Sequence, residues 1–452
     1  MPGDLRQIDA VGCLELLNFN YLLGSRTLVS GIGRLPWRAE IFGDGTITRY
    51  RAIPHGAQES TSAAIAMKLR AALEAEIEGY VEGTGRVWVL LSGGLDSRVV
   101  AGILNYLKMG WGEPKEIRAV TWGHAFARDV VYARRVAQHF GWPIHVIDYT
   151  SELFWSNMSE TADWGGGEIS GIHLHGMQAL RALVKPEDVI IAGSWGNSIG
   201  RGTFLSRHLA HLTLRAITNP YGLVVSELAP VAITEGERDR ATAWDLEEDT
   251  GSTAILELDQ QENYMRRMIG QAMDYLRAFG RLEQAFTDPA VVSLMWSFAP
   301  KYRMAEVCYH LINGLDRTLY ELPNAATGIS PGGLSEPDPL LTKSHHEFGQ
   351  WCRITHLEQL RALVKSESLA NLGVWNMSAI GSLFSKWTQQ EVNSLGLTEV
   401  ITNLAGIAMA TEIFGLHPAR DPSHMADAVR FRMGRAKAGL ARARKQLRSY
   451  VQ

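Results

Sequence analysis

Cysteine is scarce in this sequence: its three copies, Cys13, Cys308 and Cys352, are odd in number and far apart. Such spacing shows neither a disulfide framework nor a zinc site, and it is typical of chains kept in a reducing cytoplasm. The start of the chain has no basic segment followed by an apolar one, which would mark a signal peptide. We also find no apolar run long enough to predict a membrane span. These absences predict a cytoplasmic protein without a transmembrane segment.

An excess of charge of one sign is missing as well. The chain has 44 basic and 48 acidic residues and a formal net charge of −4, so charge alone gives no support to a nucleic-acid partner. We find no internal repeat and no low-complexity tract. The chain is large, with 452 residues, and 46% of them are hydrophobic. A chain of this size and composition can bury a large interior and suits two or three domains.

A glycine-rich turn between an apolar strand and a helix is the most informative motif. Residues 87–91 are apolar, the motif SGGLDS occupies residues 92–97, and a second apolar stretch follows. This order predicts a buried strand, a tight turn and a helix whose free N–H groups and positive dipole end attract an anion. Gly93 and Gly94 would let the backbone approach that anion closely, and Asp96 would hold Mg²⁺.

The turn is not a Walker loop, because it lacks the Gly-Lys-Ser/Thr that such a loop requires. A chance turn rich in serine and glycine is the alternative explanation, and the strand before it and the helix after it argue against that. Ser-Gly-Gly-x-Asp-Ser resembles the pyrophosphate loop of ATP pyrophosphatases, which cleave ATP between its α and β phosphates and activate a substrate as its adenylate. We therefore interpret the turn as a pyrophosphate site, with Ser92 and Ser97 as further donors.

Strands and helices are predicted to alternate around this motif. They are a helix over 57–81, a strand over 117–122, a helix over 129–140 and strands over 144–148 and 189–192. Strands separated by helices of this length predict a parallel, doubly wound α/β sheet. Because such sheets bind ligands beyond the carboxyl ends of their strands, the loops after Leu91, Trp122 and Ala192 should share one cleft.

The two ends of the chain differ from this core. Residues 13–50 predict short strands and turns, among them a strand at 28–32 and a hairpin around residues 43–45. Beyond about residue 205 the chain is expected to be mostly helical. From about residue 426 we expect a basic helix that could bind RNA, an anionic membrane surface or an acidic partner, although a solvated helix packed on one side is the simpler interpretation.

This order of features resembles the asparagine synthetase family, specifically its synthetase half, over residues 15–415. The resemblance implies ATP and Mg²⁺ as cofactors and an α/β fold of the pyrophosphate-loop type, with a short β-rich N-terminal remnant and a helical C-terminal half. It divides the chain into 1–55, resembling the end of a glutaminase domain; 56–205, the nucleotide-binding core; 206–415, the helical synthetase half; and 416–452, the basic helix. The residues that it implies for ATP and pyrophosphate are Leu90, Ser92, Gly93, Gly94, Asp96, Ser97, Val120 and Trp122, with Asp96 as the Mg²⁺ ligand.

The glutaminase half of the family is not expected here. Members of the family that use glutamine begin with an exposed cysteine, whose thiolate attacks the amide. This chain has Pro2 at that place and Cys13 as its nearest cysteine, and too little chain precedes the core for a complete glutaminase domain. We therefore expect no glutamine hydrolysis, so that nitrogen would arrive as ammonia or as an amine.

The phosphate region departs from the family as well. After the strand at 189–192, Ser194 stands at the family's catalytic glutamate and Asn197 at its metal-binding aspartate, and a lysine expected soon after Pro323 is missing. An asparagine keeps a carbonyl oxygen but loses the charge that Mg²⁺ favours. Arg201 is an extra cation that could compensate, with a solvated loop cation as the equal alternative. Lys301 and Lys343 are weaker candidates.

Four other features of the sequence have an ordinary structural explanation beside a functional one. His173 and His175 would share one face of a strand and could bind a metal, but no third ligand has matching spacing, so ordinary polar histidines are favoured. The pair at 345–346 is expected in a loop. Asp129 is expected to act as a dipole or capping carboxylate. Trp195 could wall a substrate pocket together with its neighbours.

These features predict an ATP-dependent ligase that forms an acyl-adenylate and then an amide with ammonia or an amine. Asp96 and Arg201 would be the catalytic residues, and Ser194, Trp195 and Asn197 would form the substrate pocket. Two alternatives stay open. One is a nucleotide-binding pseudoenzyme that regulates a partner, and the other is a peptide-modifying, macrocyclising ligase. The partners expected are a small-molecule or peptide carboxylate and an amine or ammonia.

Overall fold

The computed structural model describes residues 6–50, 53–112, 114–201, 216–242, 252–333, 335–389 and 395–419. Its centre is a five-stranded sheet with the strand order β5-β4-β3-β6-β7. The strands are β3 (Arg86–Leu90), β4 (Glu116–Trp122), β5 (Ile144–Ile147), β6 (Val189–Ala192) and β7 (Arg281–Gln284). Each neighbouring pair is parallel, which confirms the predicted α/β class.

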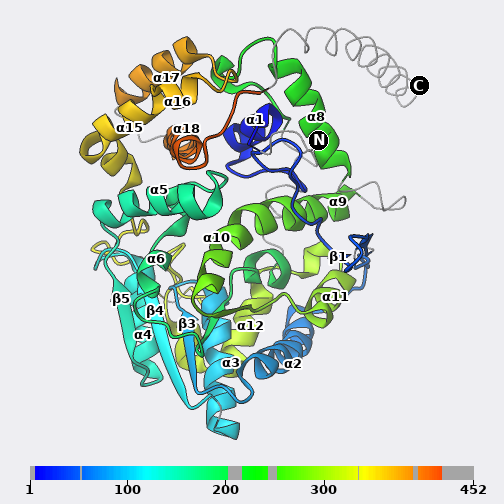
Figure 1. Ribbon diagram of the computed structural model, residues 1–452. Coiled ribbons are helices and arrows are strands. Elements are labelled where there is room, and N and C mark those ends of the chain that lie inside the picture. Colours follow the sequence, from blue (N-terminus) through cyan, green and yellow to red (C-terminus); the bar gives the residue numbers. More distant parts are fainter. Residues whose placement is uncertain are drawn as a thin grey trace, which may run out of the picture.

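Helices cover both faces of this sheet (Figure 1). Successive side chains of a strand point in opposite directions, so Val87 and Val89 enter one core and Trp88 enters another. The first core is completed by α2 (Ser62–Val81), α3 (Leu95–Trp111), α4 (Arg128–His139), α11 (Pro289–Ser297) and α12 (Ala305–Leu315). The other face carries α6 (Met177–Leu180), α10 (Gln271–Asp274) and η5 (Tyr275–Ala278). This layering is the doubly wound arrangement that the sequence predicted.

Strand β7 lies at one edge of the sheet and was not predicted. It pairs in parallel with β6, with Leu282 opposite Ile190, although the chain beyond residue 205 was expected to be mostly helical. Leu282 is the one apolar residue in the sequence Arg-Leu-Glu-Gln of this strand. An edge strand packs on fewer neighbours than a central strand, so its sequence carries little of the apolar pattern that identifies strands.

A second, helical core contains both ends of the described chain. Its helices are α1 (Ala10–Phe19), α5 (Ser151–Gly165), α8 (Ala229–Thr242), α15 (Leu357–Val364), α16 (Glu367–Ala370), α17 (Met377–Gln389) and α18 (Leu395–Phe414). In Figure 1, α1 lies beside α8 and α18, which it contacts. Residues near the N-terminus therefore share a core with the C-terminal helices and do not form a core of their own.

The N-terminal segment contains a helix where strands and turns were expected. Asp9 caps α1, because its side chain accepts from the N–H groups of Val11 and Gly12 at 2.8 and 2.9 Å. The strand predicted at 28–32 is wrong: Val29 makes only an isolated bridge to Ile8. The predicted hairpin is confirmed as β1 (Ala39–Ile41) paired with β2 (Ile47–Arg49).

Shorter elements connect these parts. They are η1 (Gly171–Leu174), η2 (Gly196–Gly200), η3 (Pro220–Gly222), α9 (Ser252–Asp259), η4 (Gln260–Gly270), η6 (Pro300–Tyr302), α13 (Arg317–Glu321), α14 (Phe348–Gln350) and η7 (Trp351–Thr355). The basic helix expected from about residue 426 lies outside the described residues.

Helix α18 is long and apolar enough to cross a membrane by length and composition, which the sequence analysis did not anticipate. The relevant window is Gly396–Phe414, with a mean hydropathy of 1.2, and 72% of it is buried inside the protein. A buried helix of this kind is typical of the centre of a helical core, where apolar residues surround it on all sides.

Candidate nucleotide and acyl-transfer site

The predicted pyrophosphate turn lies between β3 and α3, at the carboxyl edge of the sheet. Gly94 is the N-cap residue of α3, and no side chain of the described residues caps the helix there. Ser92 Oγ accepts from the Gly94 N–H at 3.1 Å and lies 3.0 Å from Ser97 Oγ, and Ser97 Oγ donates to Ser92 O at 3.0 Å. These bonds fix the turn, while the N-terminus of the helix stays open to an anion.

Gly93 is buried inside the turn and is not part of the cavity lining among the described residues. Its N–H donates to Asp129 Oδ1 at 3.0 Å, and its carbonyl accepts from Arg98 Nη2 at 2.8 Å and from the Ala325 N–H at 3.0 Å. A Cβ at this position would lie 2.8 Å from Ala325 Cβ. Glycine is therefore required here for close packing against the protein, whereas Gly94 is the glycine of the pair that lines the cavity.

A cavity of about 440 Å³ opens where the loops after β3, β4 and β6 meet. Its size is typical of small-ligand sites. Of the residues predicted to bind ATP, pyrophosphate or substrate, those that line it are Leu90, Ser92, Gly94, Asp96, Ser97, Val120, Trp122, Ser194 and Asn197. Trp195 is not part of this lining, because it packs against the first core and lies next to Gly270. Together the open helix terminus and the cavity fit an ATP molecule.

Asp96, in the first turn of α3, is held by Arg201, which directly follows η2. Arg201 Nε donates to Asp96 Oδ1 at 2.9 Å and Nη2 donates to Oδ2 at 2.6 Å, so each carboxylate oxygen has a guanidinium donor. Within the described ranges, no group of three or more His, Cys, Asp and Glu residues is placed to hold a metal ion. Mg²⁺ prefers charged oxygen ligands, and the nearby Asn197 is neutral. The donor set at Asp96 therefore does not fit the expected Mg²⁺.

Arg98 is fully buried and joins the turn to the segment after α13. Its Nη1 donates to Leu322 O at 2.7 Å, and its Nη2 donates to the carbonyls of Gly93 and Pro323. The region in which the resemblance implies a lysine therefore lies against the pyrophosphate turn, although it contains no lysine.

The two lysines named as weaker substitutes lie elsewhere. Lys301 has an exposed side chain and pairs with Glu59 at 3.4 Å, and Lys343 is exposed as well. Neither belongs to the cavity lining that the described residues form. Arg201 is therefore the one of the three candidate cations that the structure brings to Asp96.

Histidines form part of the cavity wall, and the sequence analysis did not anticipate this. His173 belongs to η1 and His175 follows it, so the strand considered for them is not formed. His173, His175 and His345 line the cavity, and each has one buried ring nitrogen without a hydrogen-bond partner among the described residues. Burial lowers the pKa of His173 to about 4 and that of His175 well below its ordinary value. These rings are neutral at pH 7 and have a lone pair that can accept a proton or a hydrogen bond.

Asp129 distinguishes His345 from the other two rings. Burial lowers the pKa of His345, and the charge of Asp129 opposes that shift. Burial also raises the pKa of Asp129, while His345 and the Gly93 N–H lower it. Asp129 lies in the first turn of α4 but makes no capping hydrogen bond to that helix. Its side chain instead accepts from the Gly93 N–H and lies within electrostatic reach of His345.

An apolar wall of the cavity comes from α6 and from a helical stretch about ninety residues further along the chain, η4 and α10. Its members are Met177 of α6, Met265, Met268 and Ile269 of η4, and Ala272 and Met273 of α10. Methionine side chains adapt to ligands of different shape. The three methionines of η4 and α10 within nine residues are a signal that sequence reasoning could have used, but nothing local shows that they face the turn.

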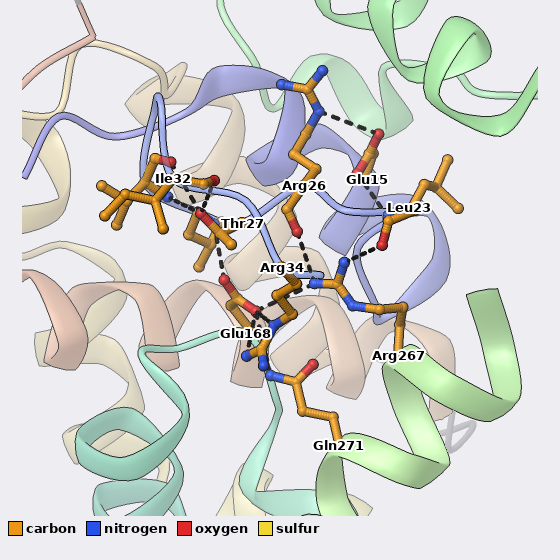
Figure 2. Close-up of polar contacts among 12 residues, drawn as sticks. Glu15, Leu23, Arg26, Thr27, Ile32, Arg34, Glu168, Arg267 and Gln271 are labelled. Carbon is orange, nitrogen blue, oxygen red and sulfur yellow. Dashed lines mark hydrogen bonds and ion pairs between the residues drawn. The ribbon is translucent and has the colours of Figure 1, made fainter. Parts of the chain in front are cut away.

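Glu168 binds the same two elements, η4 and α10, through Arg267 and Gln271 (Figure 2). Its carboxylate accepts from Arg34 Nε and Nη2 at 3.1 and 3.0 Å, from Arg267 Nη2 at 3.4 Å, from Gln271 Nε2 at 3.3 Å and from the Leu28 N–H at 3.0 Å. Arg267 also donates to the carbonyl of Gly24 at 2.6 Å. Glu168 thereby joins η4 and α10 to the N-terminal segment and holds the methionine wall in place.

The fold and the site together define an α/β nucleotide-binding protein whose phosphate turn lies at the carboxyl edge of a parallel sheet. The profile of the asparagine synthase family matches residues 68–409, so the chain belongs to the asparagine synthase family. The match supports an ATP-dependent ligase of this family, with a carboxylate and ammonia or an amine as the substrates that the family implies. A comparison with curated proteins gave no match.

Proposed function

We propose that this protein activates a carboxylic acid with ATP and transfers the acyl group to ammonia or an amine. A carboxylate oxygen attacks the α phosphorus of ATP and pyrophosphate leaves. The amine nitrogen then attacks the carbonyl carbon, AMP leaves, and the nitrogen gives up a proton. The observation that carries this proposal is the open N-terminus of α3 at a cavity lined by the ends of β3 and β4.

The phosphates of ATP would lie at the turn, beside the open N-terminus of α3 and the Ser92 and Ser97 side chains that line the cavity. Leu90, Val120 and Trp122 line the same cavity and would hold adenine, mainly through their backbone groups. Ser194 and Asn197 would contact the acid. In such a site the protein acts by positioning the reactants and by neutralising charge.

His345 would take the proton from the attacking amine. The two carboxylates of the cavity are engaged, since Asp96 pairs with Arg201 and Asp129 accepts from the Gly93 N–H. Imidazoles are the other basic groups in the lining, and His345 is the one whose basicity a carboxylate supports. General bases work best when their pKa lies near the working pH.

Ammonia, not glutamine, is the proposed nitrogen source, together with amines. All three cysteines are free and buried. Burial raises the pKa of Cys13 well above its ordinary value and that of Cys308 and Cys352 to about 12. A glutaminase needs a reactive thiolate, and these environments suppress it. Free thiols are also consistent with a cytoplasmic location.

Exchange of radiolabelled pyrophosphate into ATP tests the adenylation step without the amine. We expect exchange when the purified chain meets its acid, in a panel of amino acids, apolar acids and peptide acids. The same reactions should release AMP and not ADP. Formation of ADP, or nucleotide binding without exchange for any acid in the panel, would contradict the proposal.

The second outcome would favour a nucleotide-binding regulator. The motivation for that candidate is the Arg201–Asp96 pair at 2.6 Å, together with Ser194 and Asn197 at positions where the resemblance implies charged residues. A regulator would bind ATP with ordinary affinity and would not turn it over.

A further inference from the structure

Asp96 lies at the place where the phosphates of ATP are proposed to bind, and a bare carboxylate there would repel them. At 4 Å two like charges repel by about 1 kcal/mol in water and by several times more in a partly buried site. The two side chains of the Arg201–Asp96 pair are 15% and 17% exposed. The guanidinium therefore neutralises Asp96 in a shielded environment, where water weakens the attraction between the two charges less than at a surface.

The backbone around Arg201 is shaped to make this pair. Residues 196–200 form the turn η2, and a Cβ on Gly196 would lie 2.6 Å from Asp96 Cβ and Cγ. Only a residue without a side chain lets η2 pack this closely on Asp96. The fork of the guanidinium matches the carboxylate with two parallel bonds, which a lysine cannot reproduce. The close packing of η2 on α3 therefore fixes the geometry of the Arg201–Asp96 ion pair.

We infer that the Arg201 guanidinium takes the place of a metal ion at Asp96, so that this protein binds ATP at the turn without a cation bridging Asp96 to the phosphates. The neutral Asn197 in the same cavity lining agrees with this, because it lacks the charge that Mg²⁺ favours. The inference rests on the proposed nucleotide site but not on the adenylation reaction, because it concerns binding alone.

Arg201 lies outside the cavity lining, whereas Asp96 is part of it. The guanidinium thus neutralises the Asp96 carboxylate from outside the cavity lining. Inside the cavity, the phosphates would contact the N–H groups at the N-terminus of α3. A guanidinium has five N–H groups, and the two bonds to Asp96 use two of them. Mg²⁺ could still accompany the nucleotide on its own phosphates, but Asp96 would not be its ligand.

Calorimetry of the full chain with ATP, once in excess Mg²⁺ and once in EDTA, tests this. For the unsubstituted protein we expect the two dissociation constants to agree within about threefold. In Arg201→Met the unpaired Asp96 should weaken ATP binding in EDTA by at least about tenfold. Mg²⁺ should restore much of that loss, because the ion can now reach the carboxylate.

Two further variants keep the test independent of folding. Asp96→Asn combined with Arg201→Met removes both charges and should bind ATP equally with and without Mg²⁺. Arg277→Met, which removes an exposed arginine paired with Asp274, is the matched control and should behave like the unsubstituted protein. Thermal unfolding of each variant shows whether it is folded.

Mn²⁺ used as a probe for Mg²⁺ gives a second readout, since its electron paramagnetic resonance signal reports bound ion directly. With ATP present, Arg201→Met should bind one more Mn²⁺ than the unsubstituted protein. The inference is overturned if the unsubstituted protein needs Mg²⁺ for ATP binding, or if Arg201→Met leaves the two dissociation constants equal. Neither result would contradict the proposed adenylation reaction. Metal-independent binding without pyrophosphate exchange would leave the inference standing and remove the proposed reaction.

Discussion

The residues of the turn and the histidines of the cavity wall differ in how completely their polar atoms are paired. At the turn, the Gly93 N–H, the hydroxyls of Ser92 and Ser97 and both Asp96 oxygens have partners within the protein. Among the histidines of the lining, His173 and His345 each keep a buried ring nitrogen without a partner among the described residues. Buried polar groups are nearly always satisfied. The hydrogen bonds of the turn thus fix its shape, while a bound ligand would supply partners for the histidine ring nitrogens.

Replacing His345 is expected to have the largest effect on the reaction rate, and it directly tests the role of the unpaired histidine nitrogens. His345→Gln should slow amide formation from ammonium by about 100-fold or more, because a general base contributes 10²–10⁴-fold. Hydroxylamine needs little help from a base, so hydroxamate formation should change by less than about threefold. Both rates are measured on the acid found by pyrophosphate exchange.

His139→Gln is the control for that variant, since His139 pairs with Asp316 at 2.8 Å and does not line the cavity. It should leave both rates unchanged. An equal loss of amide and hydroxamate in His345→Gln would mean that the ring positions the adenylate and is not a base.

Glu168→Ala should destabilise the methionine wall without changing the turn. The variant leaves the buried Arg267 without its carboxylate partner, and breaking a buried ion pair costs about 3–5 kcal/mol. Urea unfolding should show a loss of that size, and Glu168→Gln should lose less because its carbonyl still accepts. A change below about 1 kcal/mol would show that Glu168 does not hold the wall.

The two glycines of the turn should respond differently to alanine. In Gly93→Ala the new Cβ meets Ala325 Cβ at 2.8 Å and the Arg128 carbonyl oxygen at 3.0 Å, an overpacking that costs about 1–3 kcal/mol. In Gly94→Ala the nearest atom is the Ser92 hydroxyl at 3.1 Å, so stability should hardly change. Thermal unfolding measures both. Equal losses would mean that Gly93 is not confined by its neighbours.

Acidification should destabilise the protein through its buried histidines. Burial lowers the pKa of His173 from 6.5 to about 4, so the unfolded chain binds the proton first as pH falls. The neutral His173 ring therefore contributes fully to the free energy of unfolding above pH 6.5, and this contribution is lost between pH 6.5 and 4. At pH 5 the loss is about 1–2 kcal/mol. His173→Asn should therefore flatten the fall in stability between pH 7 and 5. An unchanged slope would contradict the burial of this ring.

The sequence predicted the central sheet and the turn because both depend on local patterns. Apolar strands, the SGGLDS motif and helical periods are each visible within about twenty residues, and β3, β4, β5 and β6 were found where they were expected. Helix α1 was missed because most of it lies within residues 13–50, where short strands and turns were expected, and β7 because its four residues include a single apolar side chain.

The parts of the site that were missed depend on long-range contacts. His175 and His345 are 170 positions apart, and their rings lie 5.3 Å apart between centroids. The partner of Gly93 is Asp129, on the next helix of the sheet. Arg201 was recognised as a cation of the phosphate region, but that it would pair with Asp96 depends on how closely η2 approaches α3. No local pattern contains such distances.

A crystal structure of the complex with ATP is the most direct test of the nucleotide site. The account predicts the β and γ phosphates at the N-terminus of α3, within hydrogen-bond distance of the Gly94 N–H and the Ser92 hydroxyl, and adenine against Leu90 and Val120. Nucleotide bound elsewhere, or a cavity that stays empty at saturating ATP, would contradict it.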